Sequence, residues 1–425
     1  MKHTMRRLVS AILLFALCLL AMLALASCGE GEEEVEFIET PYAGTKLYVC
    51  NWGEYISDGS EGSLDVVKLF EETYGIDVEY DYFATNEELY ALLSQKAEYD
   101  VIIPSDYMIA RLAKDNLLKP LDKSKITNYH LIDSKYHGQY YDPEDMYSVP
   151  YSVGMIGVVY NTTLVDPADV ESRSWDLLWN KKEQYANGQL INFNNPRDAF
   201  GVSLISLGKS VNTTEERDWQ DAYEYLREQD CIYLMDEVFN KMENGSAAAA
   251  AYYAGDCITM MDVNSDLDFY YPDEGTNIFV DAMCIPSTSK NEGAAHLFID
   301  FMLSPDVATA NANYISYASP NTAVLSHPDY AYQPGTKGYE ILYELPESYK
   351  ADASKMQYYH NLDEATLQLM TDLWTKLGID EEEGGLEYGT IVFLSLISLG
   401  FVFIMWHYSK KAYVAFHSKK HPKSN

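Results

Sequence analysis

Aromatic and acidic side chains recur at the positions where strands of this chain are expected to end, and Arg197 is almost the only base among them. Aromatic faces pack against methylene groups and attract ammonium groups, and carboxylates accept charge-assisted hydrogen bonds from ammonium groups. Such a set suits an alkyl chain that carries several positive charges. The aromatic members are Trp52, Tyr55, Tyr107, Tyr252, Tyr253 and Phe279, and the acidic members are Glu54, Asp198, Asp256 and Asp281.

Other interpretations of these residues stay open at this point. The chain contains 36 tyrosines, so the aromatics could belong to the core or the surface, and Asp198 could simply cap a helix. Two of the acids could also serve an extracellular glycosidase as acid and nucleophile. The sequence lacks HExxH, GxSxG, GxxxxGKS/T and GxGxxG, which mark zinc proteases, hydrolases, nucleotide sites and dinucleotide sites. This absence disfavours an enzyme without excluding one, and we predict no catalytic residue, cofactor or metal.

The part of the chain between its two ends is strongly acidic. Of the 30 bases, three precede Cys28 and five follow Tyr388, so all 65 acids and 22 bases lie within residues 29–387. The formal charge of this part is therefore −43, which attracts cations and repels nucleic acid. Most of these acids form a solvated surface, so the charge favours a cationic ligand without locating its site.

The N-terminus has the pattern of an export signal. Lys2, Arg6 and Arg7 precede an apolar stretch over residues 8–26, and residues 25–28 read LASC. This ending resembles the lipobox of bacterial lipoproteins, in which the cysteine becomes the first mature residue and carries lipid. We expect residues 1–28 to form a lipoprotein signal with lipidation at Cys28, which places the rest outside the cytoplasmic membrane. An uncleaved signal anchor is the alternative.

A second apolar segment covers residues 388–408, contains no charged residue and is long enough to span a bilayer as a helix. The tail over residues 409–425 carries lysines and no acid, so the positive-inside rule places it in the cytoplasm. We therefore expect a C-terminal transmembrane helix as a second membrane anchor. A buried core helix is the alternative.

The region after an acidic linker at residues 29–45 alternates between strand and helix patterns. Strands are predicted at residues 47–50, 76–83 and 101–103, and helices at residues 64–74 and 87–96. This order indicates an open α/β sheet, in which ligands bind at the carboxyl ends of the strands. Residues 51–55 and 104–107 follow two such ends.

About 345 residues are too many for one small core, so two lobes are predicted. Extended apolar runs at residues 147–160 and 278–286 suit two crossovers between them. Lobe 1 would hold residues 46–153 and 281–325, and lobe 2 residues 154–280 and 326–383. Lobe 2 is expected to have strands at 190–193 and 247–253 and a helix at 199–208, and a helix is expected at 292–303.

Four cysteines lie in the two predicted lobes, in or beside apolar runs and without the spacing of metal ligands. Disulfides are possible in an exported protein, but buried thiols are commoner in such surroundings. The four are Cys50, Cys231, Cys257 and Cys284.

The order and spacing of short segments in the body resemble the spermidine/putrescine-binding proteins of ABC importers. The matching segments are NWGEY (51–55), TNEELYALL (85–93), YDVIIPSDY (99–107), LDKSKITNY (121–129), YSVPYSVG (147–154), NNPRDAFG (194–201), AGD (254–256), IFVDAMCIP (278–286), SPDVA (304–308) and ISYASPN (315–321). The resemblance implies the type II periplasmic-binding-protein fold, in which two α/β lobes joined by a hinge close on the ligand. It also implies a polyamine ligand and ABC permease subunits as partners, with another organic cation or an amino acid as alternative ligands.

The resemblance also assigns the residues that would bind a polyamine. It implies Trp52, Glu54, Tyr55, Ser105 and Tyr107 from the first lobe, Asp198, Tyr253 and Asp256 from the second, Phe279 and Asp281 at the opposite end, and Tyr317 as another aromatic wall. Asn195 stands where spermidine-binding members have an acid, and Tyr253 and Phe279 replace their tryptophans. The loss of one acid favours putrescine over spermidine, since a triamine gains more than a diamine from a further carboxylate.

Overall fold

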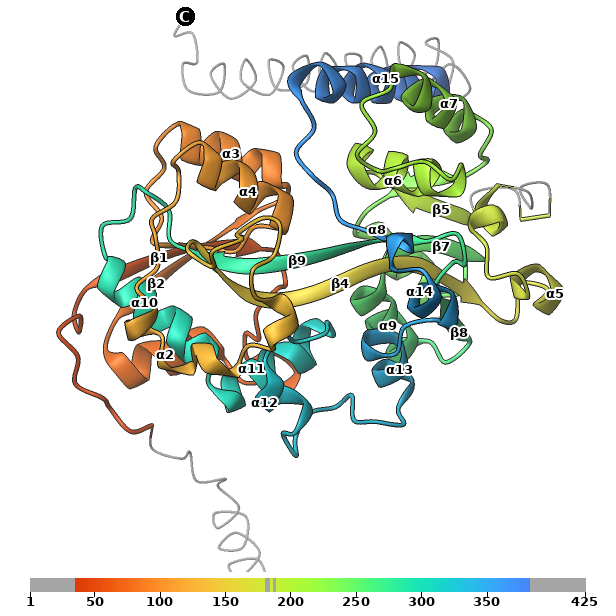
Figure 1. Ribbon diagram of the computed structural model, residues 1–425. Helices are drawn as coiled ribbons and strands as arrows, with labels where there is room; N and C mark the ends of the chain where they lie inside the picture. The colour runs from red at the N-terminus through yellow and green to blue at the C-terminus, as the bar shows by residue number, and fades with distance from the viewer. Residues whose placement is uncertain (1–34, 180–183, 186–188, 383–425) are drawn as a thin grey trace, which may run out of the picture.

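Two α/β lobes share one mixed sheet (Figure 1). The computed structural model describes residues 35–179, 184–185 and 189–382. In these residues ten strands lie in the order β2-β1-β3-β9-β4-β7-β5-β6, with β10 beside β9 and β8 beside β4. The strands are β1 (Lys46–Trp52), β2 (Asp77–Phe83), β3 (Val101–Ile102), β4 (Ser148–Asn161), β5 (Leu190–Phe193), β6 (Ile232–Leu234), β7 (Ala249–Tyr253), β8 (Leu267–Tyr270), β9 (Thr276–Cys284) and β10 (Met356–Gln357).

Helices cover both faces of the sheet in each lobe (Figure 1). They are α2 (Val66–Tyr74), α3 (Asn86–Ser94), α4 (Asp106–Lys114), α5 (Pro167–Val170), α6 (Pro196–Ser206), α7 (Glu216–Arg227), α8 (Glu237–Glu243), α9 (Ala254–Val263), α10 (Glu292–Met302), α11 (Pro305–Ile315), α12 (Thr322–Leu325), α13 (Lys337–Tyr343), α14 (Glu347–Ala351) and α15 (Glu364–Glu382). The strands and helices predicted between residues 46 and 303 appear here within a few residues of their expected ends. Of these helices, α2, α3, α6 and α10 were predicted from the sequence, and the others were not.

The first lobe has a core on each face of its sheet because neighbouring strand residues point in opposite directions. On β1, Val49 packs toward α2 and α10 with Phe298, whereas Cys50 packs toward α3 and α4 with Met108. β1 pairs in parallel with both β2 and β3. The carboxyl ends of these strands therefore meet at one edge of the lobe.

Local sequence signals set the ends of α2. The Asp65 carboxylate accepts a hydrogen bond from the Lys68 backbone N–H at 2.9 Å, which satisfies one of the free donors at the start of the helix. Gly75 ends the helix with a φ of 65°, a left-handed conformation that costs glycine little.

β4 and β9 run side by side through both lobes (Figure 1). They pair antiparallel from Ser148 and Cys284 to Met155 and Ile278, with a shift in register between Pro150 and Ser152. These strands are the two crossovers expected at residues 147–160 and 278–286. The lobe boundaries that we drew from the sequence fall within them and stay a prediction.

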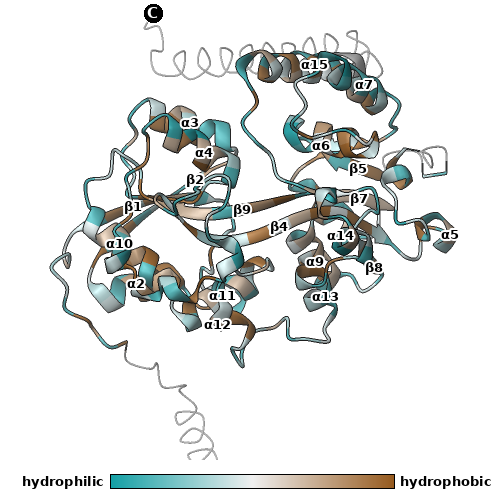
Figure 2. Cartoon of the chain, in the orientation of Figure 1, coloured by the Kyte–Doolittle hydropathy of each residue, from teal (hydrophilic) through white to brown (hydrophobic). Residues whose placement is uncertain are grey.

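The second lobe is built on β5, which pairs in parallel with β6 and β7. Helices α6, α7 and α15 lie on one side of this half of the sheet and α9 and α13 on the other (Figure 1). Hydrophobic residues colour much of β4 and β9 along the middle of the molecule, whereas α3 mixes hydrophilic and hydrophobic residues (Figure 2). Cys50, Cys257 and Cys284 are buried thiols that form no disulfide.

The predicted fold class needs one correction. The two-lobed α/β fold is confirmed, but across the described parts of the chain no helix is long and apolar enough to cross a membrane. The C-terminal transmembrane helix is therefore not retained as part of the fold. Residues 388–408 and 409–425, like Cys28, lie outside the described residues. Residues 35–45, from the predicted linker, lie against lobe 1, where the Ile38 N–H donates to the Thr73 carbonyl at 2.7 Å.

Asp100 precedes β3, and its hydrogen bonds connect this strand to β1 and to the residues before α10. Its substitution tests the fold. Its buried carboxylate accepts hydrogen bonds from the Tyr48 N–H, the Ser289 hydroxyl and the N–H groups of Lys290 and Asn291. We expect Asp100→Asn to lower the free energy of unfolding by about 2–3 kcal/mol, because an amide nitrogen cannot accept these bonds. Urea unfolding measures this loss.

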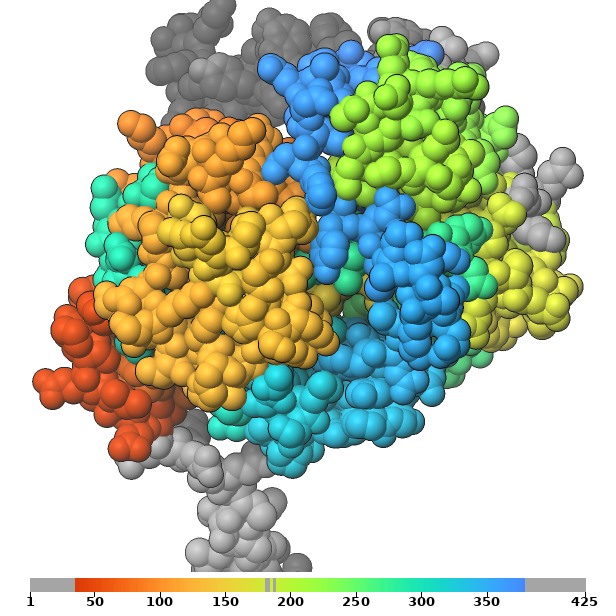
Figure 3. Space-filling model, in the orientation of Figure 1, coloured from red at the N-terminus to blue at the C-terminus, as the bar shows by residue number. Residues whose placement is uncertain are grey.

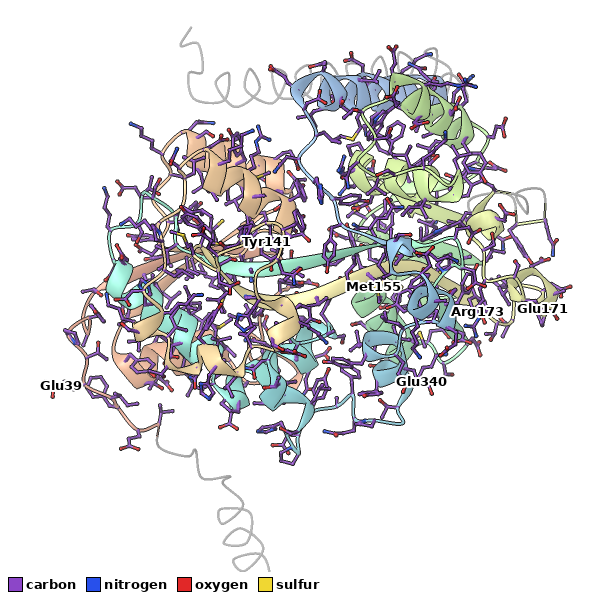
Figure 4. The ribbon with its side chains drawn as sticks, in the orientation of Figure 1. Glu39, Tyr141, Met155, Glu171, Arg173 and Glu340 are labelled. Carbon is purple, nitrogen blue, oxygen red and sulfur yellow. The ribbon has the colours of Figure 1, made fainter. Side chains whose placement is uncertain are left out.

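The matched control is Glu340→Gln on the exposed surface of α13 (Figure 4), which should change stability by less than about 0.5 kcal/mol. An equal effect of the two substitutions would contradict the role of Asp100.

Candidate ligand-binding site

Asp281 lies on β9, beside the crossover strand β4, and both of its carboxylate oxygens are engaged. The Ser105 hydroxyl donates to Oδ1 at 2.7 Å, and the Tyr55 hydroxyl donates to Oδ2 at 2.7 Å. Burial raises the pKa of Asp281 to about 6, while the hydrogen bonds from Ser105, Tyr55 and Ser152 act in the opposite direction. A buried carboxylate with only neutral partners is a strong acceptor for a cationic group.

A second buried carboxylate, Asp198, faces this region from lobe 2. It lies in the first turn of α6, whose N-cap Asn195 accepts a hydrogen bond from the Arg197 N–H at 2.9 Å. The hydroxyls of Tyr253 and Tyr359 donate to its two oxygens at 2.6 and 3.1 Å. Burial raises the pKa of Asp198, and the two phenols and the Arg197 charge oppose this effect.

Asp256 is the third carboxylate of the region and lies in the first turn of α9. The Tyr317 hydroxyl donates to it at 3.1 Å. Burial raises the pKa of Asp256 to about 7; the Tyr317 bond lowers it, and the charges of Asp236 and Glu54 raise it further. Glu54 is exposed and follows β1 with a φ of 52°. Its effect on Asp256 means that an acid of the first lobe acts on an acid of the second lobe at this site.

Aromatic rings form a continuous wall between these carboxylates. Tyr317 packs edge-on against Tyr55 at 5.6 Å between ring centroids, and Phe279 lies 6.2 Å from Tyr317 and 5.8 Å from Tyr253. Phe279 occupies space that glycine leaves free, because a Cβ on Gly154 would lie 2.2 Å from the Phe279 ring. The predicted aromatics of both lobes are thus in contact.

Three predicted residues make other contacts. The Trp52 ring packs on Phe83 at 4.5 Å, and its indole Nε1 is buried without a hydrogen-bond partner among the described residues. The Tyr107 hydroxyl donates to Glu87 at 3.1 Å. The side chain of Asn195 is used to cap α6, so its contact with a ligand stays a prediction.

Residues 358–361, which we call the bridging segment, connect β10 to α15 and contact both lobes. The Tyr140 hydroxyl from lobe 1 donates to the Tyr359 carbonyl at 2.5 Å, and the Asn361 amide donates to the Tyr107 carbonyl at 2.7 Å. On the other side, the Asn212 amide donates to the Tyr358 carbonyl at 2.8 Å. Figure 3 shows the blue C-terminal part of the chain between the orange and green masses of the two lobes.

Sequence reasoning missed two residues of this region. Tyr359 is buried, donates to Asp198 and lies beneath the Arg197 guanidinium, which is 4.5 Å from the ring centroid. Ser152 is buried on β4, directly opposite Asp281. The alternation of the crossover strand indicates which way Ser152 points, whereas Tyr359 follows a two-residue strand and has no pattern that marks it.

Comparison with known proteins assigns the family. Residues 65–338 match the model of the bacterial extracellular solute-binding proteins, which is more than half of the chain. The chain belongs to this family. A spermidine/putrescine-binding periplasmic protein of Salmonella typhimurium is 32% identical over 282 residues, covering 65% of this chain and 78% of that protein.

Solved structures of solute-binding proteins show the same architecture. A spermidine/putrescine ABC transporter substrate-binding protein from Streptococcus pneumoniae is 31% identical with a TM-score of 0.65, over 79% of this chain and 99% of that one. A lipoprotein of Treponema pallidum is 25% identical with a TM-score of 0.65, over 78% and 99%. This solute-binding protein therefore shares its whole two-lobed body with them.

The raised pKa values predict how the stability of this solute-binding protein depends on pH. Burial holds the pKa of Asp281 at about 6 and that of Asp256 at about 7, against about 4 in an unfolded chain. The folded state then binds more protons than the unfolded chain, so stability falls as pH rises from about 4 to about 8. Between pH 5.5 and 8.5 these two carboxyl groups contribute an expected loss of roughly 2–3 kcal/mol without ligand, and Asp106, whose pKa burial also raises, adds to this loss.

Urea unfolding at pH 5.5, 7 and 8.5 measures this dependence, and Asp281→Asn should make it shallower. A ligand-free protein that becomes more stable with rising pH would contradict the assignment.

Proposed function

We propose that this protein is the extracytoplasmic substrate-binding component of a polyamine ABC importer. In this role it captures putrescine or spermidine between its lobes and delivers the cation to the permease subunits without chemical change. The observation that carries the proposal is Asp281, a buried carboxylate whose hydrogen-bond donors are all neutral hydroxyls, beside a wall of aromatic rings.

The arrangement of charge supports a ligand with positive groups at both ends. Asp281 lies at the crossover strands, and Asp198 and Asp256 approach from lobe 2. Burial raises the pKa of all three carboxyl groups, and no base is among the causes that lower the pKa of Asp256 or Asp281, whereas the Arg197 charge acts on Asp198. A bound ammonium group supplies that charge, and the aromatic wall between the acids packs against the methylene chain.

The names of the matched relatives agree with this chemistry. The Salmonella and Streptococcus proteins are both described as binding spermidine and putrescine, and both align with most of their length. Because one fold serves many ligands, the relatives' names support a polyamine only together with the site. Asn195 in place of an acid favours putrescine as the preferred ligand.

Calorimetry on the full-length protein tests this function with putrescine, spermidine, γ-aminobutyrate and glucose. We expect binding of both polyamines and none of the sugar. Binding of γ-aminobutyrate alone would assign the site to a zwitterionic ligand, and binding of glucose alone would support a carbohydrate protein.

Removal of the Asp281 charge should weaken polyamine binding by about 2–5 kcal/mol, since the desolvated ammonium group would lose its charged partner. Asp281→Asn keeps the size of the side chain, and Phe279→Ala should cost less, because it removes packing but no charge. Glu340→Gln on the exposed surface of α13 is the control. Wild-type affinity in Asp281→Asn would remove this residue from the site.

We also propose that the protein is attached to the membrane through lipid on Cys28. The LASC ending of the apolar N-terminal stretch supports this, and one structurally similar protein is itself described as a lipoprotein. Cys28→Ala should abolish incorporation of a labelled fatty acid into the protein in growing cells. Undiminished labelling of this variant would place the lipid elsewhere.

A further inference from the structure

Asp106 is a buried acid that the proposed site does not use. It is the first residue of α4 and stands between two predicted site residues, Ser105 and Tyr107. Its side chain is almost fully buried, with 1% of its surface exposed. A carboxyl group in such a place needs a physical reason, because burial of an ionised acid is costly.

The carboxyl group of Asp106 joins the two segments that carry most of the site. Its Oδ2 accepts a hydrogen bond from the Val280 N–H at 3.1 Å, and its Oδ1 accepts one from the Tyr107 N–H at 2.6 Å. Val280 lies between Phe279 and Asp281 on β9. One side chain therefore connects the start of α4 to the stretch of β9 that presents both predicted ligand contacts.

Neighbouring contacts bring the same two segments together. The Ala282 N–H donates to the Pro104 carbonyl at 3.1 Å, and Ser105 and Asp281 form an isolated antiparallel bridge. The Ser105 hydroxyl, which does not cap its own helix, donates to Asp281 instead. Asp106 thus holds the backbone on which the donor and the acceptor of this bond are placed.

Every described group that changes the pKa of Asp106 is either neutral or acidic. Asp281 faces it from β9, and three phenols approach it from other segments: Tyr140 and Tyr141 before β4, and Tyr358 after β10. Figure 4 shows Tyr141 over β9, on the side of α4. Burial raises the pKa of Asp106 to about 8, the two backbone N–H groups lower it, the Asp281 charge raises it and the Tyr140 hydroxyl lowers it.

We propose that Asp106 is a positioning residue of the ammonium site, which fixes Asp281 against Ser105 and adds its own negative charge behind Asp281 when a cation binds. This inference rests on the proposed polyamine function. A cation at Asp281 favours the ionised form of Asp106, so the carboxyl group releases its proton to solvent on binding. The affinity of the protein for polyamine then rises with pH.

Calorimetry of putrescine binding to the full-length protein between pH 7 and 8.5 tests the proposal. A carboxyl group with a pKa near 8 that ionises fully in the complex makes the affinity rise about eightfold over this window, and Asp256 adds about twofold, so the wild-type rise should be about sixteenfold. In Asp106→Asn the rise should shrink to about twofold, the part that Asp256 contributes with its pKa near 7. The affinity of this variant at pH 8.5 should fall at least about tenfold.

Asp100→Asn is the matched control. Like Asp106, Asp100 is buried in lobe 1 and accepts hydrogen bonds from backbone N–H groups, but it precedes β3 whereas Asp106 follows it. It should lose stability while keeping the wild-type affinity and pH dependence. Wild-type affinity and an unchanged rise with pH in Asp106→Asn would overturn the proposal. Equal losses of affinity in both variants, with the rise retained, would overturn it too and leave Asp106 a structural residue.

Tyr140→Phe decides the question if Asp106→Asn fails to fold. This variant keeps the ring and both backbone hydrogen bonds of Asp106 but removes the hydroxyl that lowers the pKa of this acid. It also removes the bond to the Tyr359 carbonyl, a loss that changes the affinity at every pH and does not move the pH of the rise. The rise in affinity should therefore move to higher pH, and an unmoved rise would overturn the proposal. A wild-type protein that binds neither putrescine nor spermidine would overturn the polyamine function itself, and with it the role of Asp106.

Discussion

The antiparallel pairing of β4 with β9 is the constraint on which the site depends. Its register sets Ser152 opposite Asp281 and Gly154 opposite Phe279, so the crossover between lobes and the centre of the site are the same piece of backbone. A one-residue slip would turn Asp281 to the other face of the sheet and away from Tyr55 and Ser105. The predicted ligand contacts on β9 therefore lie on the same two strands that connect the lobes.

The candidate site stabilises its acids mainly with phenol and serine hydroxyls. Hydroxyl groups donate hydrogen bonds to Asp198, Asp256 and Asp281, and at Asp256 and Asp281 they leave the negative charge uncompensated, whereas the Arg197 charge acts on Asp198. A lysine or arginine partner would stabilise the ligand-free protein more and would compete with the ligand. The cost of this choice is visible in the raised pKa values, and the high tyrosine content of the chain provides the donors.

The sequence permitted most of the fold to be predicted because its signals are local. Alternation over residues 76–83 gave β2, continuous apolar runs gave β3 and β4, and helical spacing gave α2, because each pattern reflects how an element is buried. The carboxylates and aromatics could be assigned from the family resemblance and their places at strand ends. Tyr359 could not, since its position depends on where a two-residue strand and a turn lead the chain. The predicted transmembrane helix was wrong; the prediction rested on the hydropathy of residues 388–408 and on the lysines that follow them.

The bridging segment has a consequence for affinity. Its bonds to Tyr140 and Tyr107, together with the bond from Tyr317 to Asp256, join the lobes through protein groups alone. Such contacts raise the fraction of empty molecules that already adopt the closed arrangement, and the apparent dissociation constant of any ligand is inversely proportional to that fraction. Preorganisation of this kind strengthens binding of every ligand that fits equally, so discrimination between ligands is left to the carboxylates and the aromatic wall.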